Sequence, residues 1–81
     1  LAFSFKEQRE FETIDADIAE LERQAKSLEL EIEQNASDYE RLQQLMERKD
    51  QLSAELERST ERWVYLNEMA EKIAAQQAER S

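Results

Sequence analysis

The sequence predicts an all-α fold: an antiparallel two-helix coiled-coil hairpin with a short N-terminal helical segment packing at its base. The chain has no glycine and no proline, and Ala, Glu, Lys, Leu and Arg make up more than half of its 81 residues, which is typical of long helices. Two long stretches show apolar residues at alternating intervals of three and four. A cluster of turn-forming residues at 35–38 separates these stretches.

The first element is expected to begin near Phe5, because Ser4 and Glu7 have the spacing of a capping box. We expect an N-terminal basal segment over residues 3–13 and helix one over residues 14–35. The apolar positions of this stretch fit the a and d sites of a heptad repeat. In chain order they are Phe11, Ile14, Ile18, Leu21, Ala25, Leu28 and Ile32.

The hairpin turn is expected at residues 35–38, and helix two over residues 39–77. Ser37 and Glu40 have the spacing of a second capping box, and Asp38 suits the positive end of the helix dipole. A short connection of this kind makes the two helices antiparallel neighbours.

Aromatic residues are expected to gather at the open end of the hairpin. A register that pairs Ile32 with Leu45 also places Ile14 opposite Trp63. Burial of Trp63 in the seam is the first interpretation, and a stacking platform for nucleic-acid bases is the alternative. The residues expected to form the structural base are Phe3, Phe5, Phe11, Ile14, Trp63 and Leu66.

Composition also limits the possible functions. Without cysteine or histidine the chain has no disulfides, no zinc site built on thiolate or imidazole, and no Ser-His or Cys-His nucleophile. We therefore expect no enzyme activity, no catalytic residue, no metal and no cofactor in this chain. The net charge of −9 opposes general attraction to phosphate or anionic membranes. No apolar run approaches a membrane span, so a cytoplasmic fragment of a larger protein is expected.

Basic residues of helix two are the candidates for contact with nucleic acid. Arg41, Arg48 and Arg62 all occupy g positions and form one stripe, as a phosphate-contact face requires. Interhelical pairing is the alternative, with Arg48 near Glu31, Arg62 near Asp17, and no obvious partner for Arg41. The nucleic-acid-binding candidates are Arg41, Arg48, Lys49, Arg58 and Arg62.

The two ends of the pattern carry a family resemblance. The stretches FSFKEQREFE at residues 3–12, IAELE at 18–22 and ERWVYLNE at 61–68 resemble the C-terminal coiled-coil domain of Uup-type ABC-F ATPases. Many members of that family carry a Leu-Pro pair where this chain has Ile14-Asp15. A helix that continues through this point and a helix that restarts there are therefore both possible.

The resemblance implies that two ABC ATPase domains precede this arm in one cytoplasmic polypeptide, which acts on translating ribosomes. ATP and Mg would bind in those domains, and the arm would be a noncatalytic element that contacts DNA, RNA or the ribosome. The alternative is a structural coiled coil that spaces domains or mediates protein association. We expect a monomeric hairpin, and self-association through helix two beyond Leu66 is a third possibility.

Overall fold

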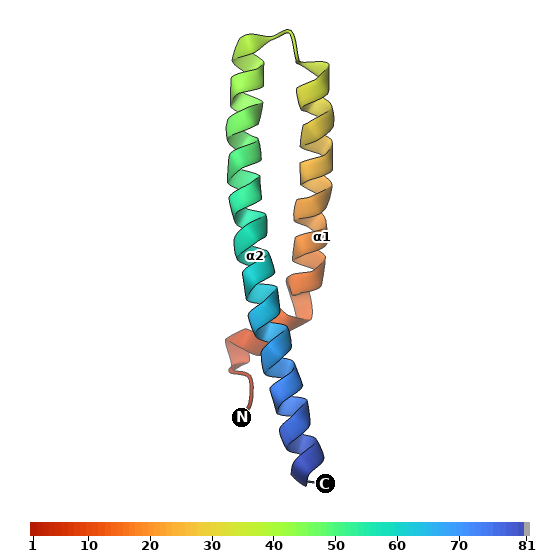
Figure 1. Cartoon of the computed structure of the whole chain (residues 1–81), viewed down its shortest axis with the longest axis vertical. Helices are drawn as coiled ribbons and strands as arrows, with labels where there is room; N and C mark the ends of the chain where they lie inside the picture. The colour runs from red at the N-terminus through yellow and green to blue at the C-terminus, as the bar shows by residue number, and fades with distance from the viewer. Residues whose placement is uncertain (81) are drawn as a thin grey trace.

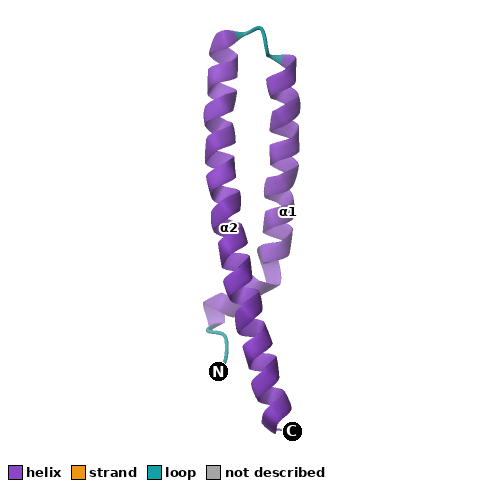
Figure 2. Cartoon of the chain, in the orientation of Figure 1, coloured by secondary structure: helices purple, strands orange, loops and turns teal. Residues whose placement is uncertain are grey.

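The computed structural model describes residues 1–80 and consists of two long helices joined by a short turn (Figure 1). Helix α1 spans Phe5–Gln34 and helix α2 spans Tyr39–Arg80. The helices run antiparallel in a rod that measures 63 × 16 × 15 Å. Figure 2 shows helix everywhere in the described range except the N-terminal tail and the turn, with no strand there. The predicted all-α antiparallel hairpin is confirmed.

The first residues of α1 are held by a complete capping box. The Ser4 Oγ accepts a hydrogen bond from the backbone N–H of Glu7 at 3.1 Å, and the Glu7 Oε1 accepts one from the backbone N–H of Ser4 at 2.9 Å. Both amides would otherwise lack an acceptor at the helix start. The capping box expected from the sequence is therefore confirmed, and Phe5 is the first helical residue.

The end of α1 depends on Asn35, which begins the turn at residues 35–38. Its backbone N–H donates to the carbonyl oxygens of Glu31 at 3.0 Å and Ile32 at 3.3 Å. Its side-chain amide also donates to the Glu31 carbonyl, at 2.7 Å. Carbonyls in the last turn of a helix need such partners. No residue among 1–80 has a positive φ angle, so the turn closes without a left-handed residue.

The start of α2 differs from the expected Ser37–Glu40 capping box. The helix begins at Tyr39, so Asp38 stands in the N-cap position. Its Oδ1 accepts a hydrogen bond from the backbone N–H of Arg41 at 3.1 Å. A carboxylate satisfies this amide and also complements the positive end of the helix dipole. Asp38 therefore caps α2 in place of Ser37.

A bend in α1 separates its first turns from the long arm of the hairpin. In Figure 1 the first turns cross behind α2 before the helix turns to run along it. In the same part of α1, the Thr13 Oγ1 donates to the carbonyl oxygens of Arg9 at 3.3 Å and Glu10 at 3.5 Å. Bonds of this kind between threonine and the preceding turn favour helix bending. The expected segment 3–13 and helix 14–35 thus belong to one bent helix.

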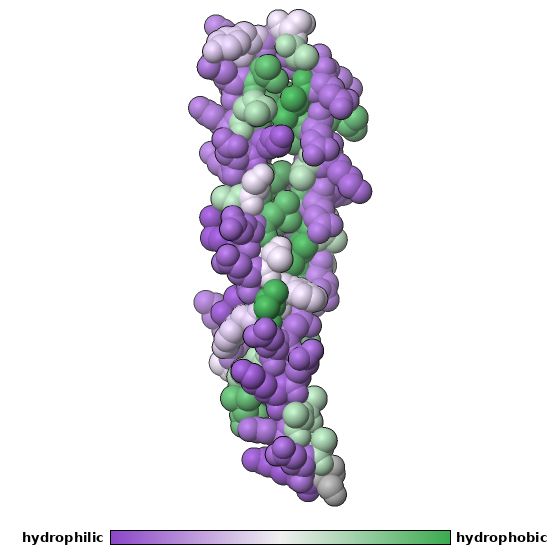
Figure 3. All heavy atoms as spheres, in the orientation of Figure 1, coloured by the Kyte–Doolittle hydropathy of each residue, from purple (hydrophilic) through white to green (hydrophobic). Residues whose placement is uncertain are grey.

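The two arms are held together by a narrow apolar seam. Leu52, which is 2% exposed, lies at its centre, and on the face seen in Figure 3 hydrophobic residues run along the middle between hydrophilic margins. Burial of this stripe removes apolar surface from water, which is the main force that joins the helices. The buried residues are Ile14, Leu28, Leu45, Leu52 and Leu66, with Leu21, Ala25 and Ile32 packed against the middle of the seam.

Candidate functional site

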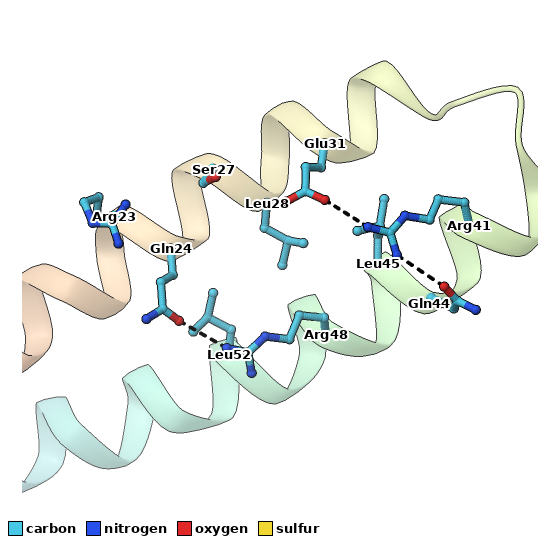
Figure 4. A pocket seen from close by; sticks show the side chains of 10 residues that line it. All are labelled: Arg23, Gln24, Ser27, Leu28, Glu31, Arg41, Gln44, Leu45, Arg48 and Leu52. Carbon is cyan, nitrogen blue, oxygen red and sulfur yellow. Dashed lines mark hydrogen bonds and ion pairs between the residues drawn. The ribbon is translucent and has the colours of Figure 1, made fainter.

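An open groove follows the seam in the half of the hairpin near the turn (Figure 4). Its rim carries the side chains of Arg23 from α1 and of Arg41 and Arg48 from α2. Arg41 and Arg48 share one face of α2 because they are seven residues, or two helical turns, apart. The other lining residues are Gln24, Ser27, Leu28, Glu31, Gln44, Leu45 and Leu52.

The arginines of α2 bind side chains across and along this groove. Arg41 donates from Nη2 to the Glu31 Oε2 at 3.2 Å and from Nη1 to the Gln44 Oε1 at 3.3 Å. Arg48 donates from Nη2 to the Gln24 Oε1 at 3.1 Å. The expected pairing of Arg48 with Glu31 is therefore wrong by one heptad, and Arg41 does have a partner. In Figure 4 the side chain of Arg41 extends from the turn end of α2 along the groove to Glu31.

Arg23 lies at the rim of the groove, although the sequence interpretation did not select it. It donates from Nε to the Glu20 Oε2 at 2.9 Å, and Gln24 donates to the Glu20 Oε1 at 3.2 Å. These hydrogen bonds lower the pKa of Glu20 to about 2. The bond from Arg23 is the larger cause, and the bond from Gln24 is the next. Arg23 occupies an f position, which usually faces solvent, so the heptad pattern could not have identified it. Only the packing of the two helices shows its place in the groove.

A second set of polar contacts lies at the open end, where the bent start of α1 crosses α2. Arg62 donates from Nε and Nη2 to the two carboxylate oxygens of Glu10, each at 2.9 Å. The expected partner was Asp17, so this pairing is also displaced by one heptad. The Arg62 guanidinium lies 4.7 Å from the centroid of the Tyr65 ring. Bidentate bonding and ring stacking together hold this arginine in one orientation.

Tyr65 extends this cluster to the first turn of α1. Its hydroxyl donates to the Glu7 Oε2 at 2.6 Å. That bond is the main reason why the pKa of Glu7 lies below its usual value, and it raises the pKa of the Tyr65 hydroxyl. The bond from Arg62 likewise lowers the pKa of Glu10. We call Glu7, Glu10, Arg62 and Tyr65 the polar base cluster. The sequence identified Glu7 as part of a capping box, but nothing in the sequence predicted the contacts of Glu7 and Glu10 with α2.

The remaining basic candidates lie apart from the groove near the turn. Arg58 lines a separate groove together with Arg62, Glu10 and Asp17. Lys49 is exposed and lies on the opposite margin of the seam from Arg48, in a depression that it lines with Ala25, Leu28, Glu29, Leu52, Ser53 and Leu56. The five candidates therefore do not form one continuous surface: two of them line the groove near the turn and three lie elsewhere.

The apolar base is smaller than the sequence interpretation suggested. The rings of Phe3 and Phe11 pack with their centroids 5.2 Å apart, and Ile14 and Leu66 are buried. Phe5 is instead 80% exposed, with the Arg9 guanidinium 5.8 Å from its ring centroid. As the first residue of α1, Phe5 lies on the outer face of the bent segment, away from the seam.

Trp63 lies at the margin of the base and not in its centre. Its side chain is 37% exposed, and its indole Nε1 donates to the Asp15 Oδ1 at 2.7 Å. An indole N–H needs a partner when its ring is partly buried, and Asp15 on α1 supplies one. The expected burial of Trp63 is therefore wrong, because the bond to Asp15 holds the ring edge at the surface.

The described residues offer neither a metal site nor a membrane-spanning helix. Residues 1–80 contain no group of three or more carboxylates placed to hold a metal ion. Neither helix in this range has a stretch long and apolar enough to cross a membrane. Both arginine-lined grooves described above are open to solvent.

Comparison with known proteins identifies the family. Residues 2–68 match the ABC transporter C-terminal domain family. The chain is also 36% identical over 70 residues to the uncharacterized ABC transporter ATP-binding protein YfmR of Bacillus subtilis (strain 168). That alignment covers 86% of this chain and 11% of YfmR, so the chain spans about a tenth of the relative's length. No solved structure matches the chain. The chain therefore belongs to the ABC transporter C-terminal domain family, a noncatalytic region of ABC ATP-binding proteins.

Proposed function

We propose that this domain is a noncatalytic arm of an ABC-F ATPase that contacts nucleic acid, either free or as part of the ribosome. The observation that carries the proposal is the groove near the turn, where the side chains of Arg41 and Arg48 lie on one face of α2. Arginine is the side chain best suited to bind phosphate oxygens with two parallel hydrogen bonds. The arm is 63 Å long, so a site near its tip is accessible to a large, extended partner.

The attached domains would supply the chemistry. The relative YfmR is named as an ATP-binding protein, and we infer that the longer protein containing this arm binds ATP and Mg in its ATPase domains. The arm would then move with those domains and bring its grooves to the nucleic acid. A cytoplasmic location fits this role, because nucleic acid and ribosomes are found there.

A structural spacer or protein-docking arm is the second candidate, and specific contacts favour it. Arg41 and Arg62 are each paired with a glutamate of α1. The whole chain carries a net charge of −9, which opposes the approach of a polyanion. In this second function the arginines would join the helices and would contact no phosphate.

Backbone NMR titration of the 81-residue chain with short duplex DNA and with structured RNA distinguishes the two functions. At about 50 mM salt, we expect amide shifts around the basic residues of α2, and at about 200 mM salt we expect them to weaken strongly, because phosphate contacts release counterions. The absence of shifts with both nucleic acids at the lower salt would reject the nucleic-acid arm and leave the spacer.

A further inference from the structure

We propose that the phosphate backbone binds in the groove near the turn, between Arg23 of α1 and Arg41 and Arg48 of α2, an inference that rests on the proposed function. Compared with the candidates from the sequence, this binding site includes Arg23 and excludes Arg62. The guanidinium of Arg62 belongs to the polar base cluster. The ligand is the phosphate backbone of a duplex or a folded RNA. The basic stripe of α2 as a whole is then not the binding surface.

The residues that line the groove carry a net positive charge, whereas the whole chain carries a net negative charge. Three arginines line the groove, and Glu31 is the one carboxylate among its lining residues. The amides of Gln24 and Gln44 and the hydroxyl of Ser27 add groups that can donate hydrogen bonds to phosphate oxygens. The chain as a whole carries a net charge of −9 and repels a polyanion, so the groove is the favourable place for one.

The contacts of the groove arginines are made at exposed positions. Arg23 binds Glu20 of its own helix, and their side chains are 69% and 50% exposed. Arg48 donates to a neutral amide oxygen, that of Gln24, so this bond does not cancel its charge. Arg41 and Glu31 are joined at 3.2 Å, and their side chains are 46% and 44% exposed. Exposed ion pairs contribute little to stability, and a phosphate can therefore replace Glu31 as the partner of Arg41.

Arg62 differs from Arg41 and Arg48, because both of its hydrogen bonds go to one carboxylate and its guanidinium also stacks on an aromatic ring. It makes two bonds of 2.9 Å to Glu10, and it stacks over Tyr65. A phosphate would have to break both bonds and leave the Glu10 carboxylate without its partner. The geometry of Arg62 thus fits a fixed role at the base, which is a different role from that of Arg48.

Spacing points to a backbone with several phosphates. Arg41 and Arg48 are two turns apart, about 10 Å along the helix axis, and Arg23 projects from the facing helix. This spacing allows Arg41 and Arg48 to contact separate phosphates of one backbone. Each groove arginine would contact its own phosphate, and each should add about 0.9 to the slope of log K against log salt on DNA.

The test compares single substitutions of the 81-residue chain. We would measure fluorescence anisotropy of labelled duplex DNA and of duplex RNA of the same sequence, from about 50 to about 200 mM salt, the range in which phosphate contacts weaken strongly. The groove variants are Arg23→Gln, Arg41→Gln and Arg48→Gln, and the matched control is Arg80→Gln at the end of α2. Circular dichroism checks that each variant keeps its helix content.

We expect each groove variant to reduce the slope on DNA by about one unit, whereas Arg80→Gln keeps the wild-type slope. Unchanged slopes in the groove variants, together with a reduction in Arg58→Gln or Arg62→Gln, would overturn the groove and keep the nucleic-acid arm. No binding by the wild-type chain to either duplex at about 50 mM salt would reject the proposed function, and the groove with it. Comparison of the DNA and RNA arms identifies which backbone is preferred.

Discussion

Arg62 of α2 binds both carboxylate oxygens of Glu10 of α1 at 2.9 Å, although 52 positions separate the two residues in the chain. This pair lies where the bent start of α1 crosses α2. It joins the first turns of α1 to the far helix at a point beyond the central part of the apolar seam. The pair therefore fixes the direction in which the chain enters the hairpin.

Removal of this pair should release the first turns of α1 without unfolding the hairpin. In Glu10→Gln, the amide cannot accept two charge-assisted bonds from the guanidinium. We expect faster backbone amide exchange for residues 6–12, measured by NMR, and unchanged exchange around Leu52 in the seam. Glu22→Gln, a substitution on an exposed part of α1, is the matched control. Equal protection in wild type and Glu10→Gln would show that the pair does not hold the base.

Acid should weaken the polar base cluster. The pKa values of Glu7 and Glu10 lie below the usual value of 4.5 in the folded chain, chiefly because of the bonds from Tyr65 and Arg62, respectively. A carboxyl group with a lowered pKa stabilises the folded state above its unfolded pKa, and that contribution is lost as the pH falls through the folded value. We therefore expect base contacts to be intact near pH 5 and above, and to be lost progressively below pH 4.5.

Carboxyl NMR titration checks this prediction group by group. Glu20 supplies an internal reference, since its pKa is lowered to about 2 by Arg23 and Gln24, away from the base. Glu10 should titrate below the usual range in the wild type and return toward it in Arg62→Gln. A normal Glu10 titration in the wild-type chain would mean that the bidentate pair is absent in solution.

Two leucines should differ strongly in how much they contribute to the free energy of unfolding, because one lies in the seam and the other is exposed. Leu52 is 2% exposed and Leu30 is 59% exposed. Leu52→Ala removes buried methyl groups and leaves a cavity, so the free energy of unfolding should fall by about 2–5 kcal/mol. Leu30→Ala should change it by no more than about 0.5 kcal/mol. Urea unfolding followed by circular dichroism measures both, and equal losses would contradict the packing described here.

The start of α2 offers a test of which residue is the N-cap. Asp38→Ala removes the acceptor for the Arg41 backbone N–H and should reduce the free energy of unfolding by about 0.5–2 kcal/mol. Ser37→Ala should have almost no effect, because Ser37 precedes the cap position. A larger loss in Ser37→Ala, by the same urea measurement, would restore the capping box expected from the sequence.

The spacing of residues along the sequence was sufficient to predict much of the fold. The heptads identified the buried seam, including Leu28, Leu45 and Leu52, because a helix with a narrow apolar stripe must cover that stripe. The Ser4–Glu7 capping box was also predictable, since both partners lie within one turn of chain. The turn-forming residues at 35–38 predicted where the chain reverses direction, because they are also neighbours in the sequence.

The partners of the arginines were decided only by the tertiary structure. A heptad repeat is unchanged by a shift of seven residues, so the pattern cannot tell Gln24 from Glu31 as the neighbour of Arg48. The packed structure makes that choice, because it decides which side chain each guanidinium reaches. One consequence is that Arg41, for which no partner was expected, pairs with Glu31.

The base shows the same division between local and tertiary information. The sequence placed the aromatic residues at the open end, but the bend in the first part of α1 decided how they are arranged there. It turns Phe5 outward and brings Glu7 and Glu10 to α2. The sequence by itself thus determined two helices, their apolar faces and the point of reversal, since these depend on periodicity and neighbouring residues. The crossing angle and the charge partners required the packed structure, because they depend on groups up to 58 positions apart.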